Sequence, residues 1–104
     1  MIKIHTKSRD GLYEAFGIYD KDGVTVIKGS RINNRNNPNF KPPVNVANKL
    51  SDRHLVDENG ILLQDIRFKS LSTSATFVTG RISNGMIVWK TDDGKNIRHS
   101  LNRE

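Results

Sequence analysis

The chain has 104 residues, of which 35% are hydrophobic and 27% are charged, and it contains no cysteine. This length predicts a single small domain, residues 1–104, without a catalytic domain beside a separate binding domain. The lack of cysteine excludes disulfides, thiolate zinc sites and cysteine nucleophiles. Lys and Arg outnumber Asp and Glu by 17 to 11, and the resulting net charge of +6 favours anionic partners.

Neither targeting nor membrane signals are visible in the sequence. Residues 1–7 have no apolar run like that of a secretory signal. No segment approaches the roughly 18 apolar residues that a membrane span requires. We therefore expect a cytoplasmic protein without a membrane partner.

The first part of the chain predicts a β-hairpin. Residues 12–19 alternate between two faces and are rich in aromatic side chains, which is typical of a strand. Residues 24–27 form a second, β-branched run, and the segment 20–23 between the two supplies turn residues. Ile2 and Ile4 favour a further short edge strand.

The segment that follows the hairpin differs in composition from the rest of the chain. Residues 31–43 are dense in Asn and Pro, which favour turns and extended backbone. We expect a long exposed loop here, and loops of this length in compact domains are often functional.

The second half predicts two helices. The first has Asn45 as its cap and runs to about Glu58, with Asn59 and Gly60 ending it. The second begins near Ser72, with Ser70 or Ser72 as its N-cap, and stops at Gly80. The apolar residues of each predicted helix share one stripe, which favours packing against a sheet.

Short strands complete the predicted fold. Residues 61–63 and 65–68 are apolar enough for strand pieces, and residues 86–89 and 97–101 follow the turn residues Asn84–Gly85 and Asp93–Gly94. The fold class is therefore α+β, a small single domain with a mainly antiparallel sheet of four to five short strands and two helices.

Catalytic constellations are missing from the sequence. The histidines His5, His54 and His99 are far apart and have no metal-ligand spacing. The paired carboxylates lie in predicted turns or helix ends, where turn and cap chemistry explains them. No glycine-rich nucleotide loop is present. We expect no enzyme, no cofactor and no metal site, and a small nuclease or hydrolase is the least favoured alternative.

Positive charge is concentrated in two windows that contain no Asp or Glu. Residues 23–51 carry five cations and residues 66–91 carry four. If the two windows meet in the folded chain, they form a patch that attracts a phosphate backbone. The alternative is an ordinary solvated loop and helix face, which the sequence leaves equally open.

Two aromatic residues have an open role. Trp89 lies in an apolar run and is expected in the core rather than stacked on a base. Phe77 lies off the apolar stripe of its helix, so it is either packed on a second face or exposed. An exposed patch around Phe77 and Phe40 would favour a protein-interaction domain.

Several motifs occur in a characteristic order. Residues 15–30 carry A-x-G-x-Y followed by G-x-x-V-x-x-G-S, and residues 55–62 carry L-V and then G-I-L. Residues 68–90 read FKSLSTSATFVTGRISNGMIVWK, and residues 93–95 read D-G-K. This order resembles the bacterial domain-of-unknown-function 4357 family, with a family-like core over residues 12–101. Leu71 replaces the family's Pro, and Thr73 and Ser74 replace two alanines.

The resemblance implies a non-catalytic accessory domain. Such domains are often appended to GIY-YIG nucleases and resemble SPSAAA-type modules of restriction and modification enzymes, so the implied partners are DNA, including modified DNA, and a nuclease or methylase. A helix that begins at Ser70 or Ser72 would also offer free backbone N–H groups to a phosphate.

We therefore predict a nucleic-acid-binding accessory module. The alternative is a protein-interaction or scaffolding domain that docks to a partner enzyme. The predicted nucleic-acid-binding residues are Lys28, Ser30, Arg31, Arg35, Lys41, Ser70, Ser72, Arg81 and Lys90.

Overall fold

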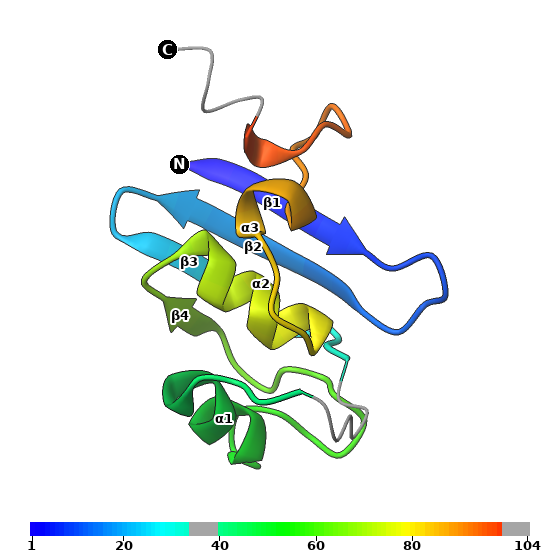
Figure 1. The fold of residues 1–104 in the computed structure, drawn as a ribbon, viewed down its shortest axis with the longest axis vertical. Helices are drawn as coiled ribbons and strands as arrows, with labels where there is room; N and C mark the ends of the chain where they lie inside the picture. The colour runs from blue at the N-terminus through cyan, green and yellow to red at the C-terminus, as the bar shows by residue number, and fades with distance from the viewer. Residues whose placement is uncertain (34–39, 99–104) are drawn as a thin grey trace.

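The structure, a computed structural model, describes residues 1–33 and 40–98. Four strands form one antiparallel sheet in the order β1-β2-β3-β4 (Figure 1). They are β1 (Ile2–Lys7), β2 (Glu14–Asp20), β3 (Gly23–Val26) and β4 (Ile66–Phe68). The hairpin and the edge strand predicted from the sequence are thus confirmed, and the class is α+β.

The register divides the sheet into two unlike faces. Ile4 lies opposite Gly17, and Thr6 lies opposite Ala15, and these residues are buried. The residues between them face the other way, because side chains alternate along a strand. They include His5, which lies opposite Phe16. One face therefore packs on the core, whereas the other is turned away from it.

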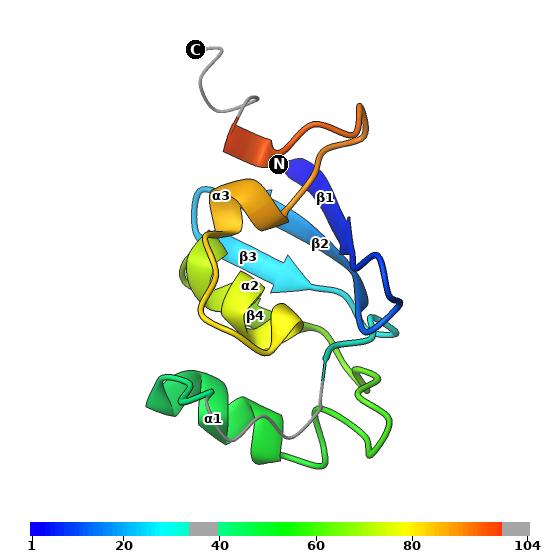
Figure 2. The same cartoon turned by 45° about the vertical axis from the view of Figure 1, so that its right-hand side comes forward.

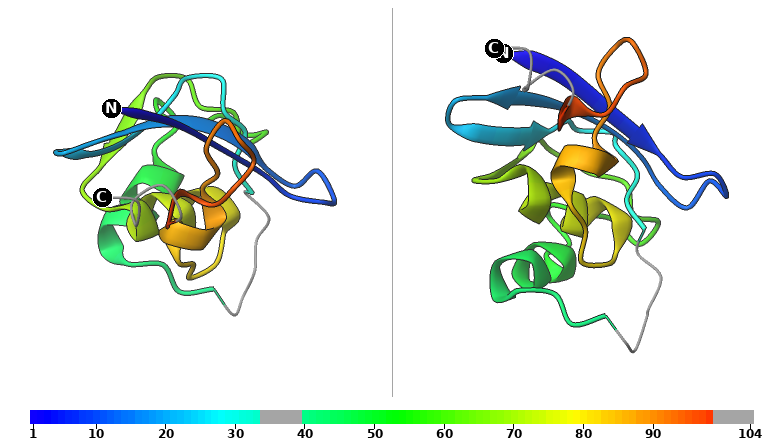
Figure 3. Two further views of the ribbon diagram at one scale, coloured as in Figure 1. Left: turned by 90° about the horizontal axis from the view of Figure 1, so that it is seen from above. Right: turned by 45° about the horizontal axis from the view of Figure 1, so that its top comes forward.

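The helices named in the described part of the chain are α1 (Val44–Ser51), α2 (Leu71–Thr79) and α3 (Gly85–Val88). Figure 2 shows α2 and α3 on the same side of the sheet, with α1 beside α2. The view from above in Figure 3 agrees, since the helices lie to one side of β1 and β2. Helices α1 and α2 correspond to the two predicted helices, and α3 is a single turn.

The core is centred on α2 and two aromatic side chains. Trp89 and Phe77 are both 0% exposed. The Trp89 indole N–H donates to the Ser74 hydroxyl over 2.9 Å, and the Phe77 ring centroid lies 5.0 Å from that of Phe68. The core position expected for Trp89 is confirmed. An exposed patch that includes Phe77 is not formed, because α2 is buried on nearly every side.

The first predicted helix is shorter than expected. α1 begins after Pro43, so Asn45 lies inside the helix rather than at its cap. It ends at Ser51 because the next residue, Asp52, is extended and its carboxylate accepts the N–H of His54 over 2.9 Å. Such local side-chain bonds compete with helix continuation. The predicted extension to Glu58 is therefore wrong.

The predicted strand over residues 86–89 is also wrong. Asn84 accepts the N–H of Met86 and caps the short helix α3 instead of forming a hairpin turn. Short apolar runs fit a strand or a buried helical turn equally well, and packing decides between them. Ile97 and Arg98 are helical as well, and residues 99–101 of the predicted last strand lie outside the described residues.

The first residues of the loop predicted over residues 31–43 are not exposed. Arg31 pairs with Glu14 and with Ile61, and Ile32 is buried. Residues 34–39 lie outside the described part of the chain. Of the strand pieces expected around residue 61, only isolated bridges form, at Ile61 and Leu62.

Candidate functional site

The N-terminal end of α2 holds two of the predicted binding residues. The Ser70 hydroxyl accepts the N–H of Thr73 over 3.1 Å and donates to the Thr73 hydroxyl over 2.8 Å. The Ser72 hydroxyl accepts the N–H of Gly85 over 3.2 Å. A Cβ on Gly85 would lie 2.2 Å from the carbonyl of Leu71. This end of α2 is therefore capped by Ser70 and closely approached by α3.

Three other predicted binding residues are spread over the molecule. Ser30 is 1% exposed, and its hydroxyl bonds both backbone groups of Phe16. Lys28 and Lys41 are exposed, and the backbone N–H of Lys28 donates to the Asp65 carboxylate over 2.8 Å. Ser30 thus connects two segments of the core, whereas the two lysines leave their side chains to solvent.

Lys90 and Arg35 are two more of the predicted nucleic-acid-binding residues. The Lys90 ammonium donates to the Ile87 carbonyl over 3.1 Å, while its backbone pairs with His5 of β1. Arg35 lies outside the described residues. Among the described residues, Lys90 thus contacts Ile87 and His5 rather than Ser70 or Ser72.

The two acid-free windows meet along β3 and β4, and again at the C-terminal end of α2. The Asn33 backbone N–H donates to the Val78 carbonyl and its side-chain amide donates to the Thr79 carbonyl, each over 2.9 Å. Gly80 ends α2 in the left-handed conformation at φ 75°, and a Cβ there would lie 3.0 Å from the Asn33 carbonyl oxygen. Gly80 is needed here for both its conformation and this close approach.

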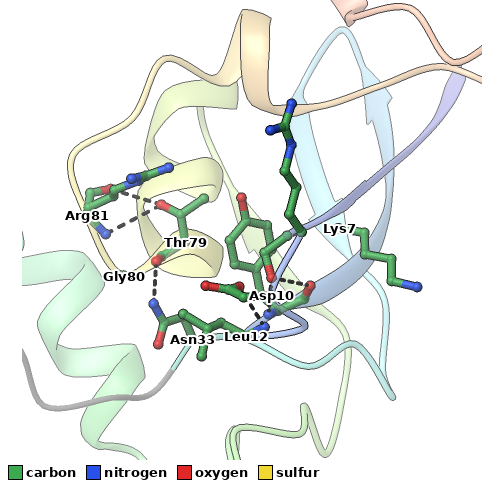
Figure 4. Close-up of a pocket in the computed structure, with 10 residues that line it drawn as sticks. Lys7, Asp10, Leu12, Asn33, Thr79, Gly80 and Arg81 are labelled. Carbon is green, nitrogen blue, oxygen red and sulfur yellow. Dashed lines mark hydrogen bonds between the residues drawn. The ribbon is translucent and has the colours of Figure 1, made fainter.

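A cavity of about 540 Å³ lies at this meeting point, between the C-terminal end of α2 and the loop that joins β1 to β2. Figure 4 shows its lining side chains, and we call it the α2 groove. Its lining residues are Lys7, Ser8, Arg9, Asp10, Leu12, Tyr13, Asn33, Thr79, Gly80 and Arg81.

The wall opposite α2 is a tight loop held by its own polar groups. The backbone N–H of Ser8 donates to the Tyr13 carbonyl over 3.0 Å, and the Ser8 hydroxyl accepts the N–H of Tyr13 over 3.1 Å. The Arg31 guanidinium donates to the Gly11 carbonyl over 2.8 Å. Arg31, a predicted binding residue, therefore supports the loop from the first acid-free window.

Cations outnumber carboxylates along the α2 groove. Lys7, Arg9 and Arg81 line it together with a single carboxylate, that of Asp10, which gives a net charge of +2. Asp10 also accepts the N–H of Leu12 over 3.2 Å and so shapes the loop. Arg9 and Arg81 come from opposite sides of the groove, so an anion bound between them would contact both walls.

Arg81 sits directly after α2 and its backbone is fixed there. The Thr79 hydroxyl hydrogen-bonds the Arg81 carbonyl over 3.0 Å and the Ser83 hydroxyl over 2.8 Å. The side chain of Arg81 is exposed, and a cation is favoured at the negative end of a helix dipole. Figure 4 shows Lys7 directed away from Arg81, toward the outside of the sheet.

Sequence reasoning found Arg81 but missed Lys7 and Arg9. Both lie near carboxylates in the chain, at Asp10 and Glu14, and therefore outside the acid-free windows. Their place in the α2 groove depends on the packing of the β1–β2 loop against α2. No local pattern in residues 7–14 signals that contact.

Two of the carboxylates predicted to act in turns, those of Asp20 and Asp93, accept backbone N–H groups within turns. Asp20 accepts the N–H of Asp22 over 2.8 Å, and this bond together with the Arg67 guanidinium holds the pKa of Asp20 below its ordinary value. Hydrogen bonds from the Thr91 hydroxyl and the Lys95 N–H likewise lower the pKa of Asp93. Among residues 1–33 and 40–98, no three His, Asp or Glu side chains are grouped so that they could hold a metal ion.

The family model described as Domain of unknown function (DUF4357) matches residues 4–101. No curated protein and no solved structure matches the chain. None of the helices in the described part of the chain has the length and apolar character needed to cross a membrane.

Proposed function

The chain belongs to the DUF4357 family, and we propose that it is a non-catalytic, cytoplasmic accessory module that binds nucleic acid through the α2 groove. The observation that carries this proposal is the meeting of the two acid-free windows at Asn33 and Thr79. The surrounding cations Lys7, Arg9 and Arg81 make the groove positive.

The α2 groove suits a phosphate backbone. Arg81 and Arg9 offer guanidinium donors from opposite walls, and guanidinium groups bind phosphate oxygens through paired hydrogen bonds. Contacts of this kind fix position along a strand without reading its sequence. The groove therefore supports binding of DNA that depends on salt and only weakly on base sequence.

The proposed partner follows from the same role. A module that holds DNA without acting on it brings another activity to its substrate, and the proposed partner is a nuclease or methylase of a restriction or modification system. The described residues group no metal ligands, and the carboxylates Asp20 and Asp93 are engaged in turns.

Fluorescence anisotropy of a labelled DNA duplex at 50 mM salt tests the proposal. Nonspecific binding in the range of roughly 1–100 μM is expected, and affinity should fall as salt rises, because bound cations release counterions. The double variant Arg9→Ala, Arg81→Ala should bind more weakly, with the slope of log affinity against log salt reduced by about 2.

Lys21→Ala is the matched control, because Lys21 is an exposed cation in the β2–β3 turn, at the other end of β2 from the groove (Figure 1). It should change affinity far less than the double variant. No binding at 50 mM salt would refute the proposal. A loss in Lys21→Ala equal to that in Arg81→Ala alone would refute the groove as the site, since only total charge would then matter.

A further inference from the structure

The face of the sheet turned away from α2 and α3 carries an exposed aromatic ring. We call this the outer face. Phe16 is 51% exposed although it lies in β2, an inner strand that is paired on both sides. His5 lies directly opposite it on β1. An exposed ring at the centre of a sheet face marks a surface suited to a flat ligand, since ring stacking needs an accessible face.

A hollow of about 340 Å³ adjoins the ring. This volume is at the lower end of the range for ligand pockets, about 300–1,000 Å³. Its outer-face lining combines apolar and polar side chains, namely Lys3, His5, Phe16, Ile18, Ile27 and Asp92. The hollow can therefore take a small flat group that has hydrogen-bonding edges.

The outer face is continuous with the α2 groove through β1. Lys3, His5 and Lys7 share one side of this strand, with neighbours about 7 Å apart. Lys7 also lines the groove. The two cations Lys3 and Lys7 therefore lie along β1 between the exposed ring of Phe16 and the groove.

These cations are accessible to a polyanion. The Lys7 ammonium lies 4.0 Å from the Glu14 carboxylate, and 65% of the Lys7 side chain is exposed, so the pair is weak and can exchange for a phosphate. Within the described residues Lys3 forms no ion pair. Arg67 is held by Asp20 over 3.2 Å at the β4 edge of the same face and is less available.

We propose that the outer face binds unpaired bases of a single-stranded nucleic acid, one base stacking on Phe16 while Lys3 and Lys7 contact the adjoining phosphates. The Asp92 carboxylate accepts a hydrogen bond from a base N–H at the rim of the hollow. This inference rests on the proposed function, because the bound nucleic-acid strand would continue from the outer face into the α2 groove. Exposed aromatics on sheets stack on bases in this way with little sequence preference.

Phe16→Leu tests the inference, because leucine keeps apolar bulk in the strand but has no ring. Anisotropy is measured with labelled 15-nucleotide single strands of thymidine and of uridine, and with a DNA duplex. Affinity for the single strands should fall by about tenfold to a hundredfold, whereas the duplex affinity should change by less than about twofold. The thymidine and uridine strands distinguish DNA from RNA as the preferred strand.

Phe16→Trp is the matched control, because its indole also stacks and reports binding by quenching. It should keep single-strand affinity, and its emission should fall on binding, whereas the buried Trp89 of the unmodified chain should change little. This readout also decides the question if Phe16→Leu does not fold. Absence of quenching refutes stacking.

The outcomes separate the two proposals. If the unmodified chain binds neither duplex nor single strands, both proposals fail. If it binds duplex and Phe16→Leu binds single strands as tightly as the unmodified chain does, only the outer-face inference fails. A dimer in light scattering that Phe16→Leu converts to a monomer would also refute the inference, since a second copy would then cover the face.

Discussion

The two ends of α2 differ in what the fold has done with them. At the N-terminal end Ser70 caps the helix and the backbone of Gly85 lies against the first turn. At the C-terminal end Gly80 turns the chain away, and Arg81 and Asn33 border a cavity. The difference teaches that a helix N-terminus with suitable residues need not be a binding site, because neighbouring backbone can occupy the space that a ligand would need.

Gly85→Ala should have the largest effect on stability, because its Cβ would push α3 away from the N-terminal end of α2. Alanine favours a helix over glycine by about 1 kcal/mol, so helix propensity alone predicts a gain. The added Cβ would instead lie 2.2 Å from the Leu71 carbonyl, and we expect a loss of about 3 kcal/mol or more in the free energy of unfolding. Urea denaturation measures it.

Ile82→Ala, in the same connection but 70% exposed, is the control for Gly85→Ala and should change the free energy of unfolding by less than about 0.5 kcal/mol. A Gly85→Ala variant as stable as the unmodified chain would contradict the close approach between α3 and the first turn of α2.

Ser74→Ala should have the next largest effect. It removes the acceptor of the Trp89 indole N–H, which is 0% exposed and would be left without a partner. We expect a loss of about 1–3 kcal/mol, measured by urea denaturation followed through Trp89 emission. Ser72→Ala, on the exposed side of the same turn, should lose less. Equal losses would contradict a larger contribution from the buried bond to Trp89.

Asn33→Ala should have the smallest effect of the three on stability. It removes the side-chain donor to the Thr79 carbonyl, a group at the open end of α2 that water can reach once Asn33 is shortened. We expect a loss of about 1 kcal/mol by thermal denaturation. A loss as large as that of Gly85→Ala would mean that both ends of α2 are equally closed.

Local patterns in the sequence predicted those elements whose signals are local. The β2–β3 hairpin follows from alternation and from the turn at residues 20–23, and α2 follows from its stripe between Ser70 and Gly80. The short helix α3 could not be predicted in this way. Its four residues fit a strand as well, and only packing against α2 selects the helix.

The candidate site was harder to predict because exposure and partners depend on the whole fold. Nothing local in the sequence shows that Ser30 is buried or that Ser72 accepts the N–H of Gly85. Charge along the sequence marks the two acid-free windows, but their meeting at Asn33 and Thr79 depends on the fold. Alternation predicts only that Phe16 lies in a strand, and its outward direction follows from the register.

The pairing of Lys90 with β1 also affects how the sheet meets other molecules. The backbone N–H of His5 donates to the Lys90 carbonyl over 2.9 Å, and the His5 carbonyl accepts the N–H of Lys90 over 2.8 Å. An edge strand with free backbone groups invites another chain to add a strand, a common route to aggregation. Because the middle of β1 is occupied in this way, two copies cannot extend the sheet through that edge without first displacing the segment that follows Trp89.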